Sequence, residues 1–124
     1  MRQRLIIHGP TVIWGLTILI LTSIPTLKPP DLGVGFSDKI AHAGVYGVFA
    51  LLLIRSFSHG LTNTNQTPQM SFLTGIVFGA VDELHQLFIP GRYAEWVDYA
   101  ADVLGTGLVV LGYIVWRRIH QPRN

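Results

Sequence analysis

The chain has 124 residues, of which 49% are hydrophobic and 13% are charged, with a net charge of +2. The charged share is about half that of a soluble domain, and the mean hydropathy of +0.42 indicates that lipid is part of the solvent. The chain has no cysteine, which excludes disulfides, thiolate metal sites and cysteine nucleophiles. Its weak, scattered positive charge excludes a nucleic-acid footprint. We therefore predict one membrane domain over residues 1–124.

The first predicted element is a transmembrane helix over residues 5–24. Twenty residues at about 1.5 Å each span about 30 Å, the thickness of a bilayer core. Pro10 is expected in the first turns, where a missing N–H costs little. The segment ends in Ser-Ile-Pro without a small-x-small cleavage signal, which favours a retained helix over a signal peptide.

A second helix is predicted over residues 38–57, after the proline-containing stretch that ends the first. Ser37 or Asp38 is a suitable N-cap. The later part of this segment, from Val45 to Ile54, is almost purely apolar. The polar residues that follow the helix predict a solvated turn.

The third and fourth helices are predicted over residues 70–89 and 97–118. Each has an apolar part too short to cross a bilayer alone, since residues 72–81 and 103–116 are bounded by acidic residues. Both helices must therefore carry their polar ends into the membrane. Small residues spaced four apart on the two helices predict close helix packing, and these pairs are Gly75 with Gly79 and Ala101 with Gly105.

Lysine and arginine placement predicts cytoplasmic N and C termini for this four-helix bundle. The inner flanks then hold Arg2, Arg4, Arg55, Arg117, Arg118 and Arg123, and the outer flanks hold Lys28, Lys39 and Arg92. Under this topology all seven acidic residues lie in the outer half or the outer loops. A charge at that depth is costly and is expected to be functional.

The topology also brings polar residues of three helices to one depth. His42 lies about 6 Å below Asp38, Gln86 and Glu83 lie about 6 and 10 Å from the outer end of their helix, and Asp102 lies about 8 Å deep. Their spacing allows each set to face the bundle interior. The sequence therefore predicts a polar, acidic cavity that opens to the outer face.

Structural roles compete with function at several of these positions. Asp98 in a first turn is favoured by the helix dipole, and Asp38 serves as a cap. Asp82 is placed to pair with His85 three residues on. Glu83, Gln86 and Asp102 are also the kind of polar residues that hold helices together in a membrane.

Metal binding and catalysis have weaker support. His42, Glu83, Asp98 and Asp102 offer one nitrogen and several oxygens that Zn²⁺ or Mg²⁺ accepts. The chain has no HExxH-like spacing, so neither a metal nor another cofactor is predicted. Paired carboxylates suit acid–base chemistry, for which Glu83, Asp102 and His42 are the candidates, but no catalytic residue is assigned.

Two stretches of the chain, DKIAHAGVYGVFALLL and DELHQLFIPGRYAEWVDYAADVLG, resemble the VanZ-like membrane proteins. The resemblance extends from Asp38 to Gly112. Position 102, an aspartate here, is often asparagine in such proteins. The family takes its name from a member linked to low-level teicoplanin resistance. The resemblance implies a multi-pass protein of the bacterial inner (cytoplasmic) membrane.

These observations together predict a small envelope protein that binds a lipid or cell-wall-precursor headgroup and modulates glycopeptide susceptibility. Membrane lipids and a lipid-linked cell-wall precursor are the expected partners, and nucleic acid is not. The expected ligand-binding residues are Asp38, Lys39, His42, Tyr46, Glu83, Gln86, Arg92, Asp98 and Asp102. A membrane-embedded acid–base or metal-assisted enzyme acting on a lipid-linked substrate is one alternative, and a structural scaffold subunit is another. The sequence favours a binding protein over an enzyme.

Overall fold

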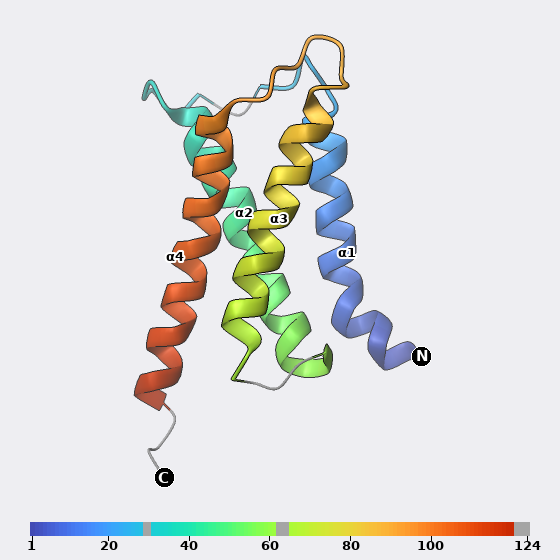
Figure 1. Cartoon of the computed structure of the whole chain (residues 1–124), viewed down its shortest axis with the longest axis vertical. Helices are drawn as coiled ribbons and strands as arrows, with labels where there is room; N and C mark the ends of the chain where they lie inside the picture. The colour runs from blue at the N-terminus through green and yellow to red at the C-terminus, as the bar shows by residue number, and fades with distance from the viewer. Residues whose placement is uncertain (29–30, 62–64, 121–124) are drawn as a thin grey trace.

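The computed structural model describes residues 1–28, 31–61 and 65–120. Pro29, Pro30, residues 62–64 and residues 121–124, which include the Arg123 of the charge pattern, lie outside the described residues. The described ranges form four α-helices joined by loops and one π-helical turn, without strands (Figure 1). These elements are α1 (Arg2–Thr22), α2 (Ser37–Ser56), η1 (Phe57–Leu61), α3 (Thr67–Gln86) and α4 (Trp96–His120). The all-α prediction is confirmed.

Two of the helices begin earlier than their patterns predict. Helix α3 begins at Thr67, and Pro68 lies in its first turn, where an N–H is not needed. Helix α1 begins at Arg2, so Pro10 lies inside it and the expectation of a first-turn proline is wrong. A proline inside a helix removes a backbone hydrogen bond and favours a kink. The first turns of α1 do bend away from the bundle (Figure 1).

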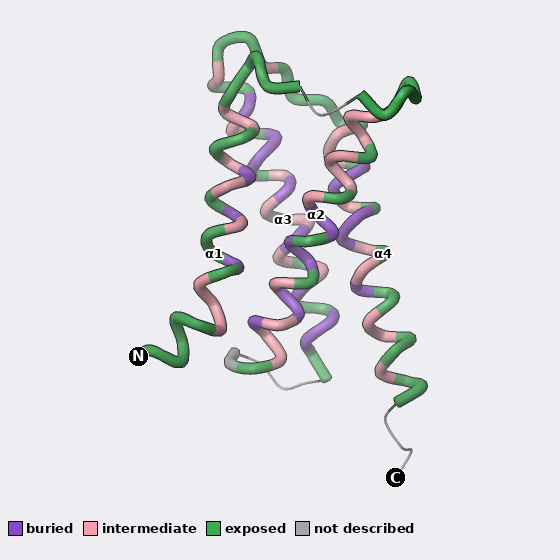
Figure 2. Tube along the Cα trace, turned by 180° about the vertical axis from the view of Figure 1, so that it is seen from behind, coloured by how far each residue is buried: buried purple, intermediate pink, exposed green. Residues whose placement is uncertain are grey.

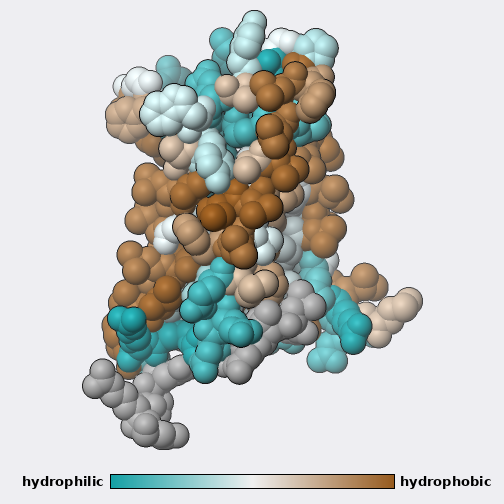
Figure 3. Space-filling view, in the orientation of Figure 1, coloured by the Kyte–Doolittle hydropathy of each residue, from teal (hydrophilic) through white to brown (hydrophobic). Residues whose placement is uncertain are grey.

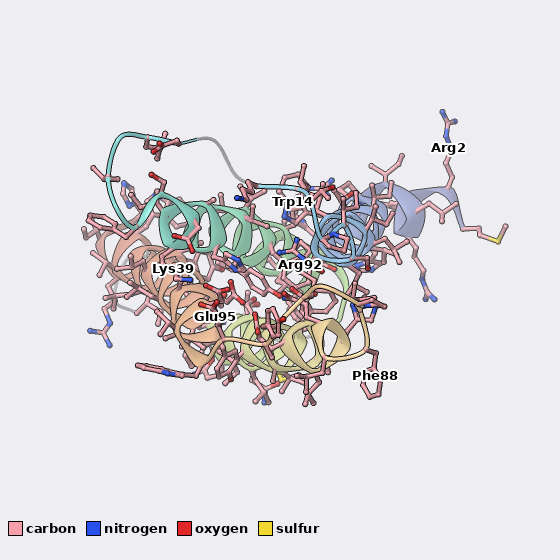
Figure 4. All side chains as sticks on the ribbon, turned by 90° about the horizontal axis from the view of Figure 1, so that it is seen from above. Arg2, Trp14, Lys39, Phe88, Arg92 and Glu95 are labelled. Atoms are coloured by element: carbon pink, nitrogen blue, oxygen red, sulfur yellow. The ribbon has the colours of Figure 1, made fainter. Side chains whose placement is uncertain are left out.

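Helix α2 is the central element of the bundle. It contacts α1, α3 and α4, most extensively α4, whereas α1 and α3 touch little. Seen end-on, α1, α3 and α4 surround α2 on three sides (Figure 4). The N-terminal end of α1 and the C-terminal end of α4 lie at the same end of the bundle (Figure 1). The C-terminal ends of α1 and α3 and the N-terminal ends of α2 and α4 meet at the other end, which carries the polar residues discussed below.

The outside of the bundle is largely apolar. A band of hydrophobic side chains runs between hydrophilic ends (Figure 3), and buried positions are confined to the sides where helices face one another (Figure 2). Several leucine and isoleucine side chains of α1 and α4 are more than half exposed, as at Leu5 and Leu108. Helix α1, the segment Ser37–His59 and α4 are each long and apolar enough to cross a membrane. An exposed apolar surface of this extent requires lipid, so the chain is membrane-embedded.

Small residues allow the helices to approach closely near the polar end. A Cβ added at Gly105 would overlap the backbone of Ala43 in α2. A Cβ at Gly75 would lie 2.7 Å from Cγ2 of Thr106 in α4. Gly75, Gly79, Ala101 and Gly105 are all buried, so both predicted small-residue pairs lie at helix contacts. The approach of α4 to α2 depends on the absence of a side chain at position 105.

We expect Gly105→Ala to destabilise the bundle by about 1–3 kcal/mol, because the added methyl forces α2 and α4 apart. Gly112→Ala is the matched control, since a Cβ at Gly112 meets open space. Thermal unfolding in detergent or nanodiscs measures both variants. Equal unfolding temperatures for the two would contradict this packing argument.

Candidate functional site

A layer of polar side chains occupies the end of the bundle where α2 and α4 begin and α1 and α3 end. This polar layer consists of Thr22, Asp38, Lys39, His42, Tyr46, Asp82, Glu83, Gln86, Arg92, Glu95, Asp98 and Asp102. The structure brings all nine residues of the predicted ligand-binding set into it. Three further members, Thr22, Asp82 and Glu95, are outside that set. The layer mixes exposed residues at the bundle end with fully buried ones beneath them.

Lys39 is the centre of the exposed part of the layer. Its Nζ lies 2.8 Å from Oδ2 of Asp38 and 3.2 Å from Oε2 of Glu95, and it also forms an ion pair with Oδ1 of Asp98. Lys39 and Glu95 lie close together beside the start of α4 (Figure 4). Three carboxylates therefore surround one ammonium group, which leaves this cluster with a net negative charge.

His42 joins the exposed cluster to the buried carboxylates. Its Nδ1 lies 2.9 Å from Oδ1 of Asp102, and its Nε2 lies 3.8 Å from Oδ2 of Asp98. A carboxylate beside one ring nitrogen fixes the orientation and tautomer of an imidazole. Asp102 is 1% exposed, and its second oxygen, Oδ2, has no hydrogen-bond partner among the described residues.

Glu83 connects α3 with the loop before α4. Its Oε1 accepts a hydrogen bond from Nε2 of Gln86 at 3.2 Å, and its Oε2 accepts one from the backbone N–H of Glu95 at 3.0 Å. Both Glu83 and Gln86 are buried. Glu83, His42 and Asp102 each offer a ligand atom within 4.8 Å of the others, so these three residues could together hold a metal ion.

Asp82 has a larger role than its sequence context indicated. Its Oδ1 accepts a hydrogen bond from the hydroxyl of Thr22 at 2.7 Å, and its Oδ2 accepts one from the hydroxyl of Tyr46 at 3.2 Å. Within the described part of the chain, Nδ1 of His85 has no hydrogen-bond partner and Asp82 forms no ion pair with His85, so the predicted pairing of these two side chains was wrong. Asp82 is fully buried and joins α3 to α1 and α2. The available signal was its i, i+4 relation to Gln86, which places both on one helix face.

Arg92 attaches the loop between α3 and α4 to the end of α1. Its Nη2 donates to the carbonyl oxygens of Ile24, at 2.9 Å, and Leu21, at 3.3 Å. A cation is favoured at these positions because the last carbonyls of a helix carry partial negative charge. Arg92 therefore has a structural role besides any contact with a ligand.

Two hollows adjoin within the layer. One, of about 310 Å³, is mainly apolar and lies against α1, α2 and the end of α3; its lining includes Ile18, Leu21, Ala41, Val45 and Tyr46. The other, of about 450 Å³, lies at the bundle end; its lining includes Asp31, Asp38, Glu95 and Asp98. Both are lined by Leu27, Lys28, His42, Gln86 and Arg92. A polar hollow thus continues into an apolar one.

The fold and the layer define a class: a helical membrane protein with buried carboxylates and a histidine at one end of the bundle. The VanZ/LLP1 family model matches residues 9–118, which is most of the chain, so the chain belongs to that family. Comparison with curated proteins and with solved structures returns no match. The family assignment confirms the resemblance carried by the two sequence stretches, and the link with antibiotic resistance is context from the family as a whole.

We expect Thr22→Val to destabilise the protein by about 1–3 kcal/mol, because Oδ1 of buried Asp82 loses its donor from α1. Thr17→Val is the matched control, since the Thr17 hydroxyl donates to the carbonyl of Ile13 in its own helix. That change should stay within about 0.5 kcal/mol. Thermal unfolding in the same detergent compares the two. A Thr22 variant as stable as the Thr17 variant would show that this hydrogen bond contributes nothing.

Proposed function

We propose that this chain binds the headgroup of a membrane lipid or of a lipid-linked cell-wall precursor within the polar layer. The observation that carries the proposal is the junction of the two hollows, which share five lining residues. A molecule with a polar head and a hydrocarbon chain matches this arrangement, since its head fits the polar hollow and its chain fits the apolar one. We expect binding of such a headgroup to alter the susceptibility of the cell to glycopeptides.

The charges along the junction suggest which part of a headgroup binds where. Lys28 and Arg92 line both hollows, and neither forms an ion pair with a described residue. They are suited to a phosphate. Lys39, by contrast, is already surrounded by carboxylates, so it is less suited to a phosphate. The carboxylates, His42 and Gln86 are suited to hydroxyl, amide or amine groups.

The proposal includes a topology of four membrane spans with both termini in the cytoplasm of a bacterial cell. It is supported by the charge pattern and by the N-terminal end of α1 and the C-terminal end of α4, which lie at the same end of the bundle (Figure 1). Under this topology the polar layer opens to the outer face of the inner membrane. Helix α3 crosses with its acidic residues shielded by the other three helices.

Single cysteines test this topology cleanly because the natural chain has none. We expect a cysteine at Glu95 to react with a membrane-impermeant maleimide in intact cells, and a cysteine at Gln66 to react after the cells are opened. Both native side chains are exposed. Labelling of both positions from the same side would overturn the four-span arrangement.

Native-lipid purification followed by mass spectrometry tests headgroup binding. We expect the wild-type chain to enrich a phosphate-containing lipid over the bulk membrane. Ala41→Phe, which fills the apolar hollow, should reduce this enrichment about tenfold, equivalent to about 1.4 kcal/mol of binding free energy.

Ile40→Phe is the matched control, since Ile40 is exposed beside Ala41 and does not line the hollow. It should retain the lipid. A wild-type sample with the bulk lipid composition would remove the proposal and favour the scaffold alternative. Unfolding temperatures of both variants show whether any loss reflects misfolding.

The hydrogen bond between His42 and Asp102 favours a second candidate, a membrane-embedded enzyme that acts on the same lipid. An imidazole oriented by a buried carboxylate is a common general base. The mass spectra separate the two candidates. A binding protein returns the enriched lipid unchanged, whereas an enzyme yields a product with an altered headgroup when the lipid is supplied.

A further inference from the structure

His42, Glu83 and Asp102 come from three different helices and meet near the middle of the polar layer. One ligand atom of each lies within 4.8 Å of the others, and Nδ1 of His42 is 2.9 Å from Oδ1 of Asp102. Zinc binds histidine nitrogen and carboxylate oxygen at about 2.0–2.2 Å, so two ligands of one ion lie at most about 4.4 Å apart. Small side-chain rotations would therefore place all three atoms around one ion.

The charge balance of these residues points to a cation. Glu83 is 7% exposed and Asp102 is 1% exposed. Two carboxylates buried close together are costly unless they are compensated. The known partners leave a deficit, because Oδ2 of Asp102 is buried and has no hydrogen-bond partner among the described residues. This unpartnered oxygen is an observation separate from the grouping of the three residues.

We propose that His42, Glu83 and Asp102 form a binding site for a divalent transition metal, with zinc the preferred ion. An imidazole nitrogen favours zinc over magnesium. Three protein ligands leave a fourth coordination position. His42 lines both hollows, so that position is accessible from them to water or to a ligand group.

Asp98 lies near the other ring nitrogen of His42, slightly beyond hydrogen-bond distance, where a small shift would make it an outer partner of the histidine. Its Oδ2 lies 3.8 Å from Nε2 of His42, on the opposite side of the ring from Asp102. Histidine ligands of zinc commonly donate their second N–H to a carboxylate, which fixes the ring and raises its basicity. Asp98 is itself anchored by Lys39. The site therefore stands on its own geometry and does not require that a lipid binds.

Zinc binding by the full chain in lipid nanodiscs tests the site. The protein is stripped with a chelator, equilibrated with zinc, and its bound metal is measured by mass spectrometry. The wild-type chain should hold about one zinc ion. His42→Gln, Glu83→Gln and Asp102→Asn should each weaken zinc binding by more than about tenfold, since loss of even an outer partner costs that much.

His59→Gln is the matched control for His42→Gln, because it removes an exposed histidine in η1, at the end of α2 away from the polar layer. It should bind zinc as the wild-type chain does. Equal zinc in the wild-type and Asp102→Asn proteins, or equal losses in His59→Gln and His42→Gln, would overturn the site.

Cobalt substitution keeps the test decisive if a ligand variant fails to fold. The wild-type chain loaded with cobalt should show the intense visible absorption of a four-coordinate site with nitrogen and oxygen ligands, and its absence would overturn the proposal on the wild-type protein alone. Zinc binding without lipid enrichment would contradict the headgroup proposal and leave the metal site. Lipid enrichment without zinc binding would contradict the metal site and leave the headgroup proposal.

Discussion

The burial of three carboxylates inside an apolar bundle is the constraint on which the rest of this structure depends. Asp82, Glu83 and Asp102 are each less than a tenth exposed. A carboxylate facing lipid near the centre of a helix costs about 2.5–3.5 kcal/mol on insertion scales. Hydrogen-bond donors from several helices and from the loop before α4 offset part of this cost. Asp82 receives hydroxyls from α1 and α2, Glu83 an amide and a backbone N–H, and Asp102 an imidazole.

Close packing of the helices follows from the same constraint. Several of the donors stand on facing helices, so they reach the carboxylates only where the helix backbones lie near one another. Gly105 permits that approach between α4 and α2, and Gly75 does so between α3 and α4, where a Cβ would overlap Thr106. In lipid the helices gain little from the hydrophobic effect, and polar contacts and small residues hold them together instead. The glycines and the buried carboxylates therefore depend on each other, because close packing at the glycines brings the donors within reach of the carboxylates.

The sequence predicted the helices and the composition of the polar layer because both depend on local pattern. Apolar segments of membrane-spanning length, and polar residues spaced three or four apart at their ends, are visible without coordinates. The partners of Asp82 and Arg92 were not predicted. Thr22 is separated from Asp82 by 60 residues. Arg92 donates to backbone carbonyls, which every residue has, so the residue types do not reveal this contact. The bend of α1 was missed because the helix begins at Arg2, earlier than its apolar run.

Residues 92–95 connect the end of α1 to other residues of the polar layer. Arg92 holds the carbonyl end of α1, while Glu95, three residues on, contacts Glu83 through its backbone and Lys39 through its side chain. Because α1 touches α3 little, this segment and the hydrogen bond from Thr22 to Asp82 are, among the described residues, the main connections between α1 and the end of α3. Four residues thus join the end of α1 to a buried carboxylate and to an ion pair of the layer. A substitution that reshapes this segment would therefore alter the contacts of α1, Glu83 and Lys39 together.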